Sequence, residues 1–374
     1  MEITQFRWTP DSGWEPPPTS AHGADLVLAF SDADYFRSPE CYRDLRGFFP
    51  AAHIVGCSSS GSICNTHISD ADIVVTAVKF EKGRVQLVSA EAASGEDLHA
   101  LAIRLVGGLE GADLRHAFVL SDGLSVNGSD LARGLNSRGI SVTGGLAGDG
   151  ARFASTWVMA DAPAAQNVVA IVGFYGDLAA KCGCVAGWHE FGAERRVTRS
   201  RGNVVFEIDN EPALAIYTKY LGDLAKDLPG SGLRFPLSIR STAQDEPVIR
   251  TLLAIDAAAQ SLTFAGDVPQ GAFCRLMKTD VDSLIDGSGM AADAAKSGAN
   301  AKPGLCLIVS CVGRRLVMGQ LTEEELDIVR ERLGPSPAIT GFYSYGELAP
   351  FANAEGCRLH NQTMTLTTLS ELIP

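Results

Sequence analysis

Short runs of apolar residues, separated by glycine or polar turns, dominate the chain and predict many β-strands. The run over 24–30 is apolar throughout, as expected of a strand that is buried on both faces. Runs over 73–80 and 85–90 flank a Glu-Lys-Gly turn and predict an antiparallel hairpin. Apolar residues recur at helical spacing over 94–109. Hairpins together with crossover helices predict a mixed α/β (α+β) fold, with mixed sheets covered by helices.

A strand–turn–helix–strand pattern occurs twice and ends each time in a glycine-containing stretch. The first stretch is Ile140–Gly150 (ISVTGGLAGDG) and the second is Ala338–Pro350 (AITGFYSYGELAP). Each contains Thr-Gly, and Glu347 takes a place like that of Asp149. The simpler interpretation is that any two αβ units share such a pattern. We expect internally related αβ units whose two stretches line one site.

Composition and charge limit the classes of partner. The chain has 374 residues, enough for two domains, and its first 22 residues, which contain three consecutive prolines, predict an extended tail. A net charge of −13 disfavours nucleic acid and anionic membranes as partners. No apolar run reaches the roughly 18 residues that span a bilayer.

The cysteines and the N-terminus point to one compartment. Nine cysteines without a secretory signal indicate reduced thiols, and we expect a cytoplasmic protein. Cys182-Gly183-Cys184 is too weak a signal to predict a metal site.

The loop Gly56–Gly61 (GCSSSG) follows a predicted strand and is a candidate anion cradle, because small residues let backbone N–H groups approach a ligand. The same loop allows an enzyme hypothesis, with Cys57 as a nucleophile at a strand-to-loop corner. The loop narrowly misses the G-x-S-x-G pattern, and no general base can be assigned to it.

Six motifs in order resemble one family. GCSSSG, SDG at 121–123 and TGGLAGDG at 143–150 resemble the FIST N-terminal domain, and CVGRR at 311–315, GFYSYGE at 341–347 and HNQTM at 360–364 resemble the FIST C-terminal domain. The resemblance implies an intracellular sensory module that binds small ligands such as amino acids and signals through a partner. It also implies an N-terminal domain over 23–225 and a C-terminal domain over 226–374.

An amino-acid ligand requires a guanidinium or N–H cluster at one end and an acid at the other. Arg314 or Arg315 could supply the first and Asp149 or Glu347 the second, with two tyrosines as a wall on one strand face. The alternative is that the acid caps a turn and the tyrosines fill the core. The candidate ligand-binding residues are Cys57, Ser58, Ser59, Gly145, Asp149, Arg314, Tyr343, Tyr345, Glu347 and Asn361.

The resemblance also leaves a haem hypothesis open, because some family members are haem-based nitric-oxide sensors that regulate a histidine kinase. No CxxCH motif occurs, so haem would bind non-covalently. His189, beside Trp188 and Phe191, is the candidate axial ligand, and His360 and His53 are rivals. The expected partners are a small molecule and a signalling protein such as a histidine kinase, and a homodimer is left open.

Overall fold

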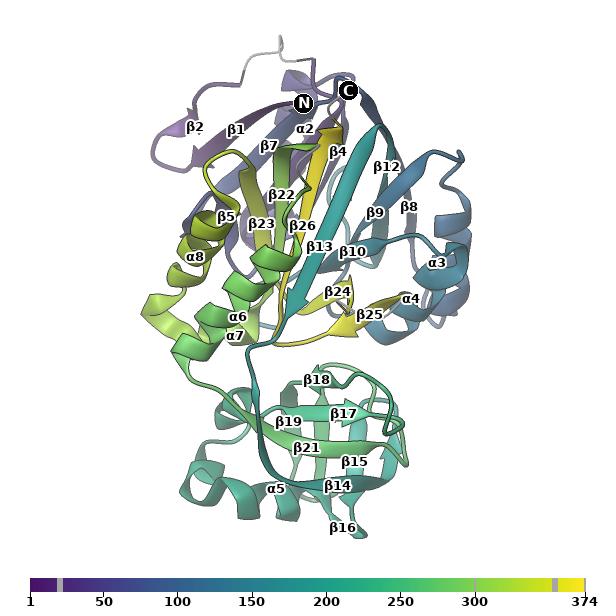
Figure 1. Cartoon of the computed structure of the whole chain (residues 1–374), viewed down its shortest axis with the longest axis vertical. Helices are drawn as coiled ribbons and strands as arrows, with labels where there is room; N and C mark the ends of the chain where they lie inside the picture. Colours follow the sequence, from purple (N-terminus) through teal and green to yellow (C-terminus); the bar gives the residue numbers. More distant parts are fainter. Residues whose placement is uncertain (19–22, 299–300, 352–355, 373–374) are drawn as a thin grey trace.

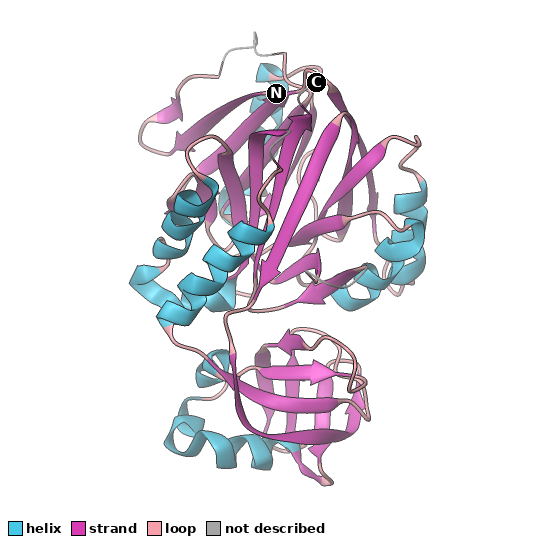
Figure 2. Cartoon of the chain, in the orientation of Figure 1, coloured by secondary structure: helices cyan, strands magenta, loops and turns pink. Residues whose placement is uncertain are grey.

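The computed structural model describes residues 1–18, 23–298, 301–351 and 356–372 (Figure 1). They form a large body of three six-stranded sheets with helices on its outside, and a small domain built on one eight-stranded sheet (Figure 2). The predicted mixed α/β class, in two domains, is confirmed. The hairpin predicted from the runs over 73–80 and 85–90 is wrong, because β7 (Ile73–Lys79) pairs with β1 and β3 whereas β8 (Gly83–Glu91) pairs with β12 in another sheet. Within the described residues, no helix has both the length and the apolar character that a membrane span needs.

The three sheets of the body have the same strand order at their centres and differ at their edges. The first runs β11, β4, β3, β7, β1, β2, with β1 at Glu2–Thr9, β2 at Gly13–Glu15, β3 at Leu26–Ser31, β4 at His53–Ser58, β7 at Ile73–Lys79 and β11 at Val158–Ala160. The second runs β25, β24, β10, β9, β12, β8, with β8 at Gly83–Glu91, β9 at Leu114–Ser121, β10 at Val142–Leu146, β12 at Val168–Gly176, β24 at Gly346–Pro350 and β25 at Cys357–His360. The third runs β6, β5, β23, β22, β26, β13, with β5 at Ser62–Cys64, β6 at His67–Ser69, β13 at Leu178–Val185, β22 at Ala301–Cys311, β23 at Ala338–Ser344 and β26 at Met364–Leu372.

Each sheet is organised around one parallel strand pair, β3–β4, β9–β10 or β22–β23. A helical crossover joins each pair, and the crossover helices are α1 at Ala33–Phe36, α2 at Pro39–Phe48, α4 at Gly128–Leu135, α7 at Val312–Met318 and α8 at Glu324–Leu333. After its second strand, each unit sends a short strand into the next sheet: β5 beside β23, β11 beside β4 and β24 beside β10. The pattern predicted twice therefore occurs three times and closes a ring.

One glycine in each parallel pair lets two backbones pass at very short range. A Cβ added to Gly56, Gly144 or Gly341 would lie 1.9–2.0 Å from the carbonyl oxygen of the residue paired with it on the neighbouring strand. No side chain fits such a distance, so the same steric requirement fixes glycine at the same place in all three units.

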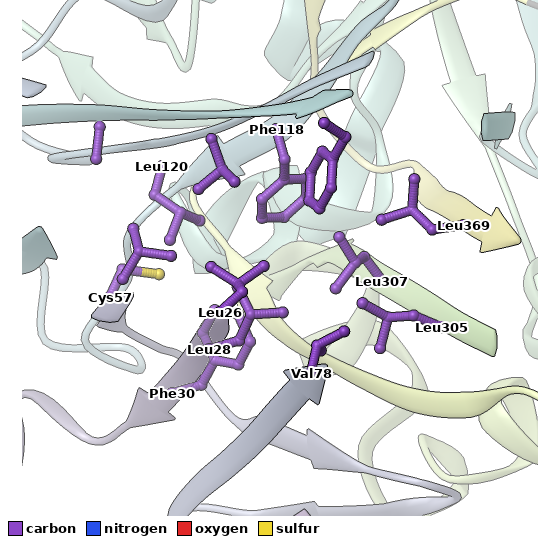
Figure 3. Packing of buried hydrophobic residues seen from close by; sticks show 14 of the residues in the cluster. Leu26, Leu28, Phe30, Cys57, Val78, Phe118, Leu120, Leu305, Leu307 and Leu369 are labelled. Carbon is purple, nitrogen blue, oxygen red and sulfur yellow. The ribbon is translucent and has the colours of Figure 1, made fainter. Parts of the chain in front are cut away.

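The inner faces of the three sheets pack against one another in a shared core (Figure 3). Phe30 comes from the first sheet, Phe118 from the second and Leu307 from the third, and each is at most 1% exposed. Helices cover the outer faces: α2 on the first sheet, α3 (Leu98–Gly107) with α4 on the second, and α6 (Val281–Ala294) with α8 on the third. Burial on both faces explains the continuous apolar runs of the sequence.

The N-terminal residues differ from the predicted extended tail. β1 pairs with β7 along seven residues and β2 pairs with β1, so most of the segment belongs to the first sheet. Phe6 is 1% exposed in the core beneath it, and Trp8 and Trp14 pack edge-on against Tyr35 and Phe48. From Gln5 to Thr9 the apolar residues of β1 alternate with polar ones, a short strand signal that the three prolines obscured. Residues 19–22 of the predicted tail lie outside the described residues.

The small domain is inserted between β13 and α6 (Figure 1). Its elements are β14 at His189–Arg201, β15 at Val204–Ile208, β16 at Glu211–Pro212, α5 at Ala213–Leu221, β17 at Leu237–Arg240, β18 at Val248–Arg250, β19 at Leu252–Asp256, β20 at Ser261–Phe264 and β21 at Phe273–Lys278. The junction expected near residue 225 falls inside this domain, where Ala225 packs on its core. A single cut cannot separate the two bodies, because the chain leaves the large body and returns to it.

Candidate functional site

The ends of the three second strands meet in a ring of backbone hydrogen bonds. Ser60 N donates to Tyr343 O at 2.8 Å and Tyr343 N donates to Gly61 O at 2.9 Å. Tyr345 N donates to Leu146 O at 3.1 Å, and Gly148 N donates to Ser58 O at 3.0 Å. The stretches TGGLAGDG and GFYSYGE therefore lie side by side, and GCSSSG joins them as the third member.

The GCSSSG loop does not offer free amides to an anion. The N–H groups of Ser58, Ser59 and Ser60 all donate to backbone carbonyls of neighbouring segments. The Ser58 hydroxyl accepts from Trp157 N at 3.0 Å, and the Ser59 hydroxyl lies 2.9 Å from Ser62 Oγ. An anion cradle needs several N–H groups that point at the ligand, and here they stabilise the strand crossing instead.

Cys57 and Gly145 are fully enclosed by packing. Cys57 is 0% exposed in the shared core, and burial raises the pKa of its thiol well above the usual value. A nucleophilic cysteine needs a thiolate that can reach a substrate, and neither condition holds. A Cβ on Gly145 would lie 2.5 Å from Val309 Cγ1, so this glycine serves the close packing of the sheets.

Asp149 holds the loop that follows it. The backbone N–H groups of Phe153, Ala154 and Ser155 each donate to its carboxylate at 2.9 Å, and the Tyr345 hydroxyl donates as well. Burial alone would raise the pKa of Asp149, but these hydrogen bonds outweigh it and the pKa is lowered. The carboxylate is therefore ionised and fully used by protein groups, which fixes the loop over 149–155.

This loop presents an aromatic pair. Phe153 stacks on Tyr345 with ring centroids 4.6 Å apart and an interplanar angle of 13°. Phe153 has a φ of 49°, a left-handed conformation that is unfavourable for a side chain of this size, and it is 45% exposed. The bonds to Asp149 hold the backbone there, so an aromatic ring is kept at the surface against Tyr345.

Arg314 is a structural residue of the body. Its guanidinium is 0% exposed and forms an ion pair with Glu325 at 2.8 Å. It also donates to Ala186 O, Leu284 O and the Ser288 hydroxyl at 2.7–2.8 Å. These contacts leave it no free edge for the carboxylate of a ligand.

The two tyrosines do not share a wall, contrary to the expectation from their spacing. The Tyr343 hydroxyl donates to Glu325 at 2.6 Å and its ring packs in the core under α6 and α8. Strand β23 ends at Ser344, and the chain then crosses to the second sheet, where Tyr345 packs in a different cluster. The alternation of strand faces stops at that crossing.

Arg315 faces a hollow on the outside of the ring. It donates twice to Asp70, at 2.6 and 2.7 Å, and once to Ser60 O at 2.5 Å. The hollow is also lined by Arg152 and Asp149. Of the two adjacent arginines, Arg315 is therefore the one that reaches a recess in the surface.

Glu347 is a buried carboxyl within the ring. It accepts from the Ser344 hydroxyl at 2.6 Å and from the Thr363 amide and hydroxyl at 3.1 and 2.8 Å, and it is 0% exposed. Burial raises its pKa from 4.5 to about 7. Glu347 does not line either of the two cavities between the body and the small domain that are described below.

The raised pKa of Glu347 makes stability depend on pH. The folded protein holds this proton to a higher pH than the unfolded chain, so its contribution to the unfolding free energy falls by about 3 kcal/mol from pH 4.5 to 7. Urea denaturation at pH 5 and pH 8 measures this effect. Between these two pH values, the free energy of unfolding should fall less in Glu347→Gln than in the wild type. Equal losses in the two proteins would contradict the assignment.

A cavity of about 160 Å³ lies between the body and the small domain. The body contributes Phe153, Cys311, Val312, Gly313, Leu316, Tyr345 and Asn361, and the small domain contributes Pro229, Gly230, Leu233, Thr251, Leu252, Leu253 and Ala265. Among the described residues, eight buried side-chain N or O atoms lack a hydrogen-bond partner, and three of them border this cavity. They are Asn361 Oδ1, Asn361 Nδ2 and Thr251 Oγ1.

The mouth of the cavity is apolar and exposed. Leu253, Leu316 and Phe153 line it and are 42–45% exposed, although large apolar side chains are usually covered. A second hollow continues from it past Phe153 and Tyr345 to Leu124, which is 44% exposed. Apolar walls around a few unpaired polar groups are the usual character of small-molecule sites.

The three candidate haem ligands do not border this cavity. His189 is exposed and its Nε2 lies 2.9 Å from Ser283 Oγ, while Trp188 and Phe191 pack in two different clusters rather than around one space. His360 is 1% exposed with Nε2 bonded to Ala349 O, and burial lowers its pKa to about 4.

The third candidate, His53, bonds Asp161 at 2.7 Å. Each of the three rings thus has one nitrogen hydrogen-bonded to a protein group. In the part of the chain that the structure describes, no group of three or more His, Cys, Asp or Glu residues is placed to hold a metal ion.

Several residues of this cavity carry no motif. Thr251 and Leu253 lie in an ordinary alternating stretch of the small domain, and Phe153 follows the TGGLAGDG stretch without any pattern of its own. Asn361, in contrast, belongs to HNQTM and was among the expected ligand residues. A threonine or phenylalanine in a polar loop gives no signal until the fold places it beside a cavity.

The fold is a two-domain α/β module with an apolar-walled cavity between its domains. The chain belongs to the FIST family: the FIST N domain matches residues 25–211 and the FIST C domain matches residues 213–350. FIST domains are small-ligand-sensing domains of signal transduction. The boundary between the two matches falls inside the small domain, so each match covers part of it.

The chain has a distant similarity to solved structures of other proteins. A chorismatase has 9% identity and a TM-score of 0.35, and the alignment covers 99% of this chain and 98% of that chain. A cyanuric acid hydrolase from A. caulinodans has 10% identity and a TM-score of 0.38, with 99% of each chain covered. Likenesses this distant do not transfer an activity. No curated protein matches the chain.

Proposed function

We propose that this protein is a sensor whose ligand binds in the cavity between the body and the small domain, and that the bound state is read by a partner protein. The observation that carries the proposal is the unpaired Asn361 amide, 1% exposed and on the cavity wall with both polar atoms free. A buried amide without hydrogen-bond partners lowers the stability of a protein by roughly 1–3 kcal/mol. A ligand that forms hydrogen bonds with this amide removes that penalty and therefore binds more tightly.

The lining favours a neutral ligand with an apolar body. The described residues of the cavity wall include no Asp, Glu, Lys or Arg. An amide side chain offers one donor and one acceptor side by side, which complements the edge of a primary amide, a lactam or a carboxylic acid. Thr251 supplies a hydroxyl, and the apolar surface of Leu253 and Phe153 would cover the rest of the ligand.

A free amino acid would need charged partners in addition. The hollow beside Arg315 and Arg152 shares Val312 and Leu316 with the cavity, so charged ends would have to reach that hollow. Both arginines are already paired, with Asp70 and Asp32, and a ligand would compete with these ion pairs. A ligand screen should therefore contain amino acids as well as neutral amides and lactams.

Signalling would follow from the position of the cavity. Its walls come from two bodies that are joined by two short connections, so a ligand that contacts both changes the free energy of their association. A partner such as a histidine kinase would recognise the altered arrangement.

Replacing Asn361 with Leu separates function from stability. The change removes an unpaired buried amide, so we expect the free energy of unfolding without ligand to be unchanged or higher by about 1 kcal/mol. Ligand-dependent stabilisation should be lost, as a thermal-shift screen of both proteins would show. A marked loss of stability in the ligand-free variant would mean that the amide has partners and would remove the basis of the proposal.

A further inference from the structure

A second cavity, of about 260 Å³, lies at another part of the domain junction and is lined by four arginines. Arg240 and Arg250 come from the small domain, and Arg133 and Arg358 come from the body. The chain carries 44 acidic and 31 basic residues, so a basic side chain would be expected to find an acidic partner. Arg133 and Arg240 do, in Asp130 and Glu194.

Arg250 is buried without such a partner. It is 5% exposed, and its Nε and Nη1 donate only to the backbone carbonyls of Asp267, Ile249 and Leu359, at 3.0–3.1 Å. Among the residues that the structure describes, Nη2 of Arg250 meets no acceptor and no carboxylate forms an ion pair with this side chain. Burial lowers the pKa of Arg250 to about 10, as expected of a positive charge that is incompletely compensated.

Arg358 lies in the same wall and also has no carboxylate partner within the described chain. It donates to the Glu246 carbonyl at 3.2 Å and its guanidinium lies over the Phe351 ring at 5.8 Å. The side chains of Asp245, Glu246 and Asp267 complete the charged lining.

Two of these acids are engaged elsewhere. Asp245 accepts from Thr242 N at 2.8 Å, and Asp267 accepts from Asn127 Nδ2 at 3.4 Å and faces Arg133 at 3.8 Å. Asp267 also lies near enough to Arg250 for its charge to raise the pKa of that guanidinium, but burial outweighs it and the two form no ion pair.

We propose that this second cavity binds a small oxyanion, a carboxylate or a phosphate, between the free Nη2 edge of Arg250 and the guanidinium of Arg358. A guanidinium presents parallel N–H groups that match the two oxygens of such an anion, and a buried one binds more strongly than an exposed one. Arg250 already ties β18 to β25 through the Leu359 carbonyl. An anion bound here contacts Arg250 of the small domain and Arg358 of the body, and so adds a second interaction between the domains. Binding of the anion thereby regulates their association.

The test measures thermal stability while inorganic phosphate or acetate replaces chloride at constant ionic strength, because bulk screening then stays the same. We expect a saturable rise in melting temperature with at least one anion, and the anion that acts identifies the class. Arg358→Gln should raise the half-saturating concentration at least tenfold. Arg43→Gln, the same change on the exposed face of α2, should leave it unchanged.

Arg250→Lys keeps the charge but loses the planar edge, and where it folds it should behave as Arg358→Gln does. No saturable response to either anion, or the same half-saturating concentration in Arg358→Gln and Arg43→Gln, would overturn the proposal. Thr251→Val should keep the full anion response, so this test is independent of the neutral-ligand cavity.

Discussion

Replacing Glu325 with Leu is expected to lower the free energy of unfolding by about 3–5 kcal/mol, because it leaves the Arg314 guanidinium buried without its counter-charge. The Tyr343 and Ser310 hydroxyls lose their acceptor at the same time. Urea denaturation monitored by circular dichroism measures the loss, and it should appear as a lower midpoint.

Two further variants show whether the pair is responsible. Glu324→Leu makes the same change on the exposed side of α8 and should alter stability by less than about 0.5 kcal/mol. Arg314→Met combined with Glu325→Leu removes both charges and should recover a large part of the loss. A double variant as unstable as Glu325→Leu would show that the pair is not the cause.

Gly341→Ala is expected to cost about 3 kcal/mol or more, or to prevent folding, because the new Cβ would lie 1.9 Å from the Ile308 carbonyl oxygen. That oxygen belongs to the parallel partner strand, so neither group can move without breaking the register of the sheet. Gly56→Ala and Gly144→Ala should be equally severe if the three units are equivalent. The yield of soluble protein and its urea midpoint measure the effect.

Gly47→Ala is the matched control. Gly47 lies within α2, and a Cβ there would meet no atom within 4 Å. We expect this variant to be as stable as the wild type, or more stable by about 0.5–1 kcal/mol, because alanine favours the helix. If the three strand glycines also tolerate alanine, the close crossing of the backbones is not a requirement of the fold.

Of the three strand–turn–helix–strand units, the sequence reveals only those whose residues at equivalent positions are alike. The Thr-Gly pairs at Gly144 and Gly341 reveal two units, but the third unit carries Val55 in place of threonine. What all three share is a steric requirement at one glycine, and a single glycine is too common to be a signal. The ring of strands that enter neighbouring sheets involves contacts between residues about 90–290 positions apart, which local patterns do not encode.

The roles of the candidate residues depend on contacts that local patterns cannot supply. Arg314 and Arg315 are adjacent in sequence. Arg314 forms a buried ion pair with Glu325, whereas Arg315 reaches a hollow in the surface. The motifs do indicate where the strands cross, because small residues are needed there. They do not indicate the small domain that forms half of the cavity, since its sequence contains only ordinary alternating strands.

The interdomain cavity is proposed to bind a small ligand through its unpaired polar groups, Asn361 and Thr251. Thr251→Val and Thr340→Val test this proposal directly, because both remove a buried, unpaired hydroxyl and only Thr251 borders the cavity. A thermal-shift screen with neutral amides, lactams and amino acids should find a compound that raises the melting temperature of the wild type and Thr340→Val by about 3 °C or more, and of Thr251→Val by clearly less. A compound that stabilises all three proteins equally, or a screen without any stabilising compound, would contradict the claim.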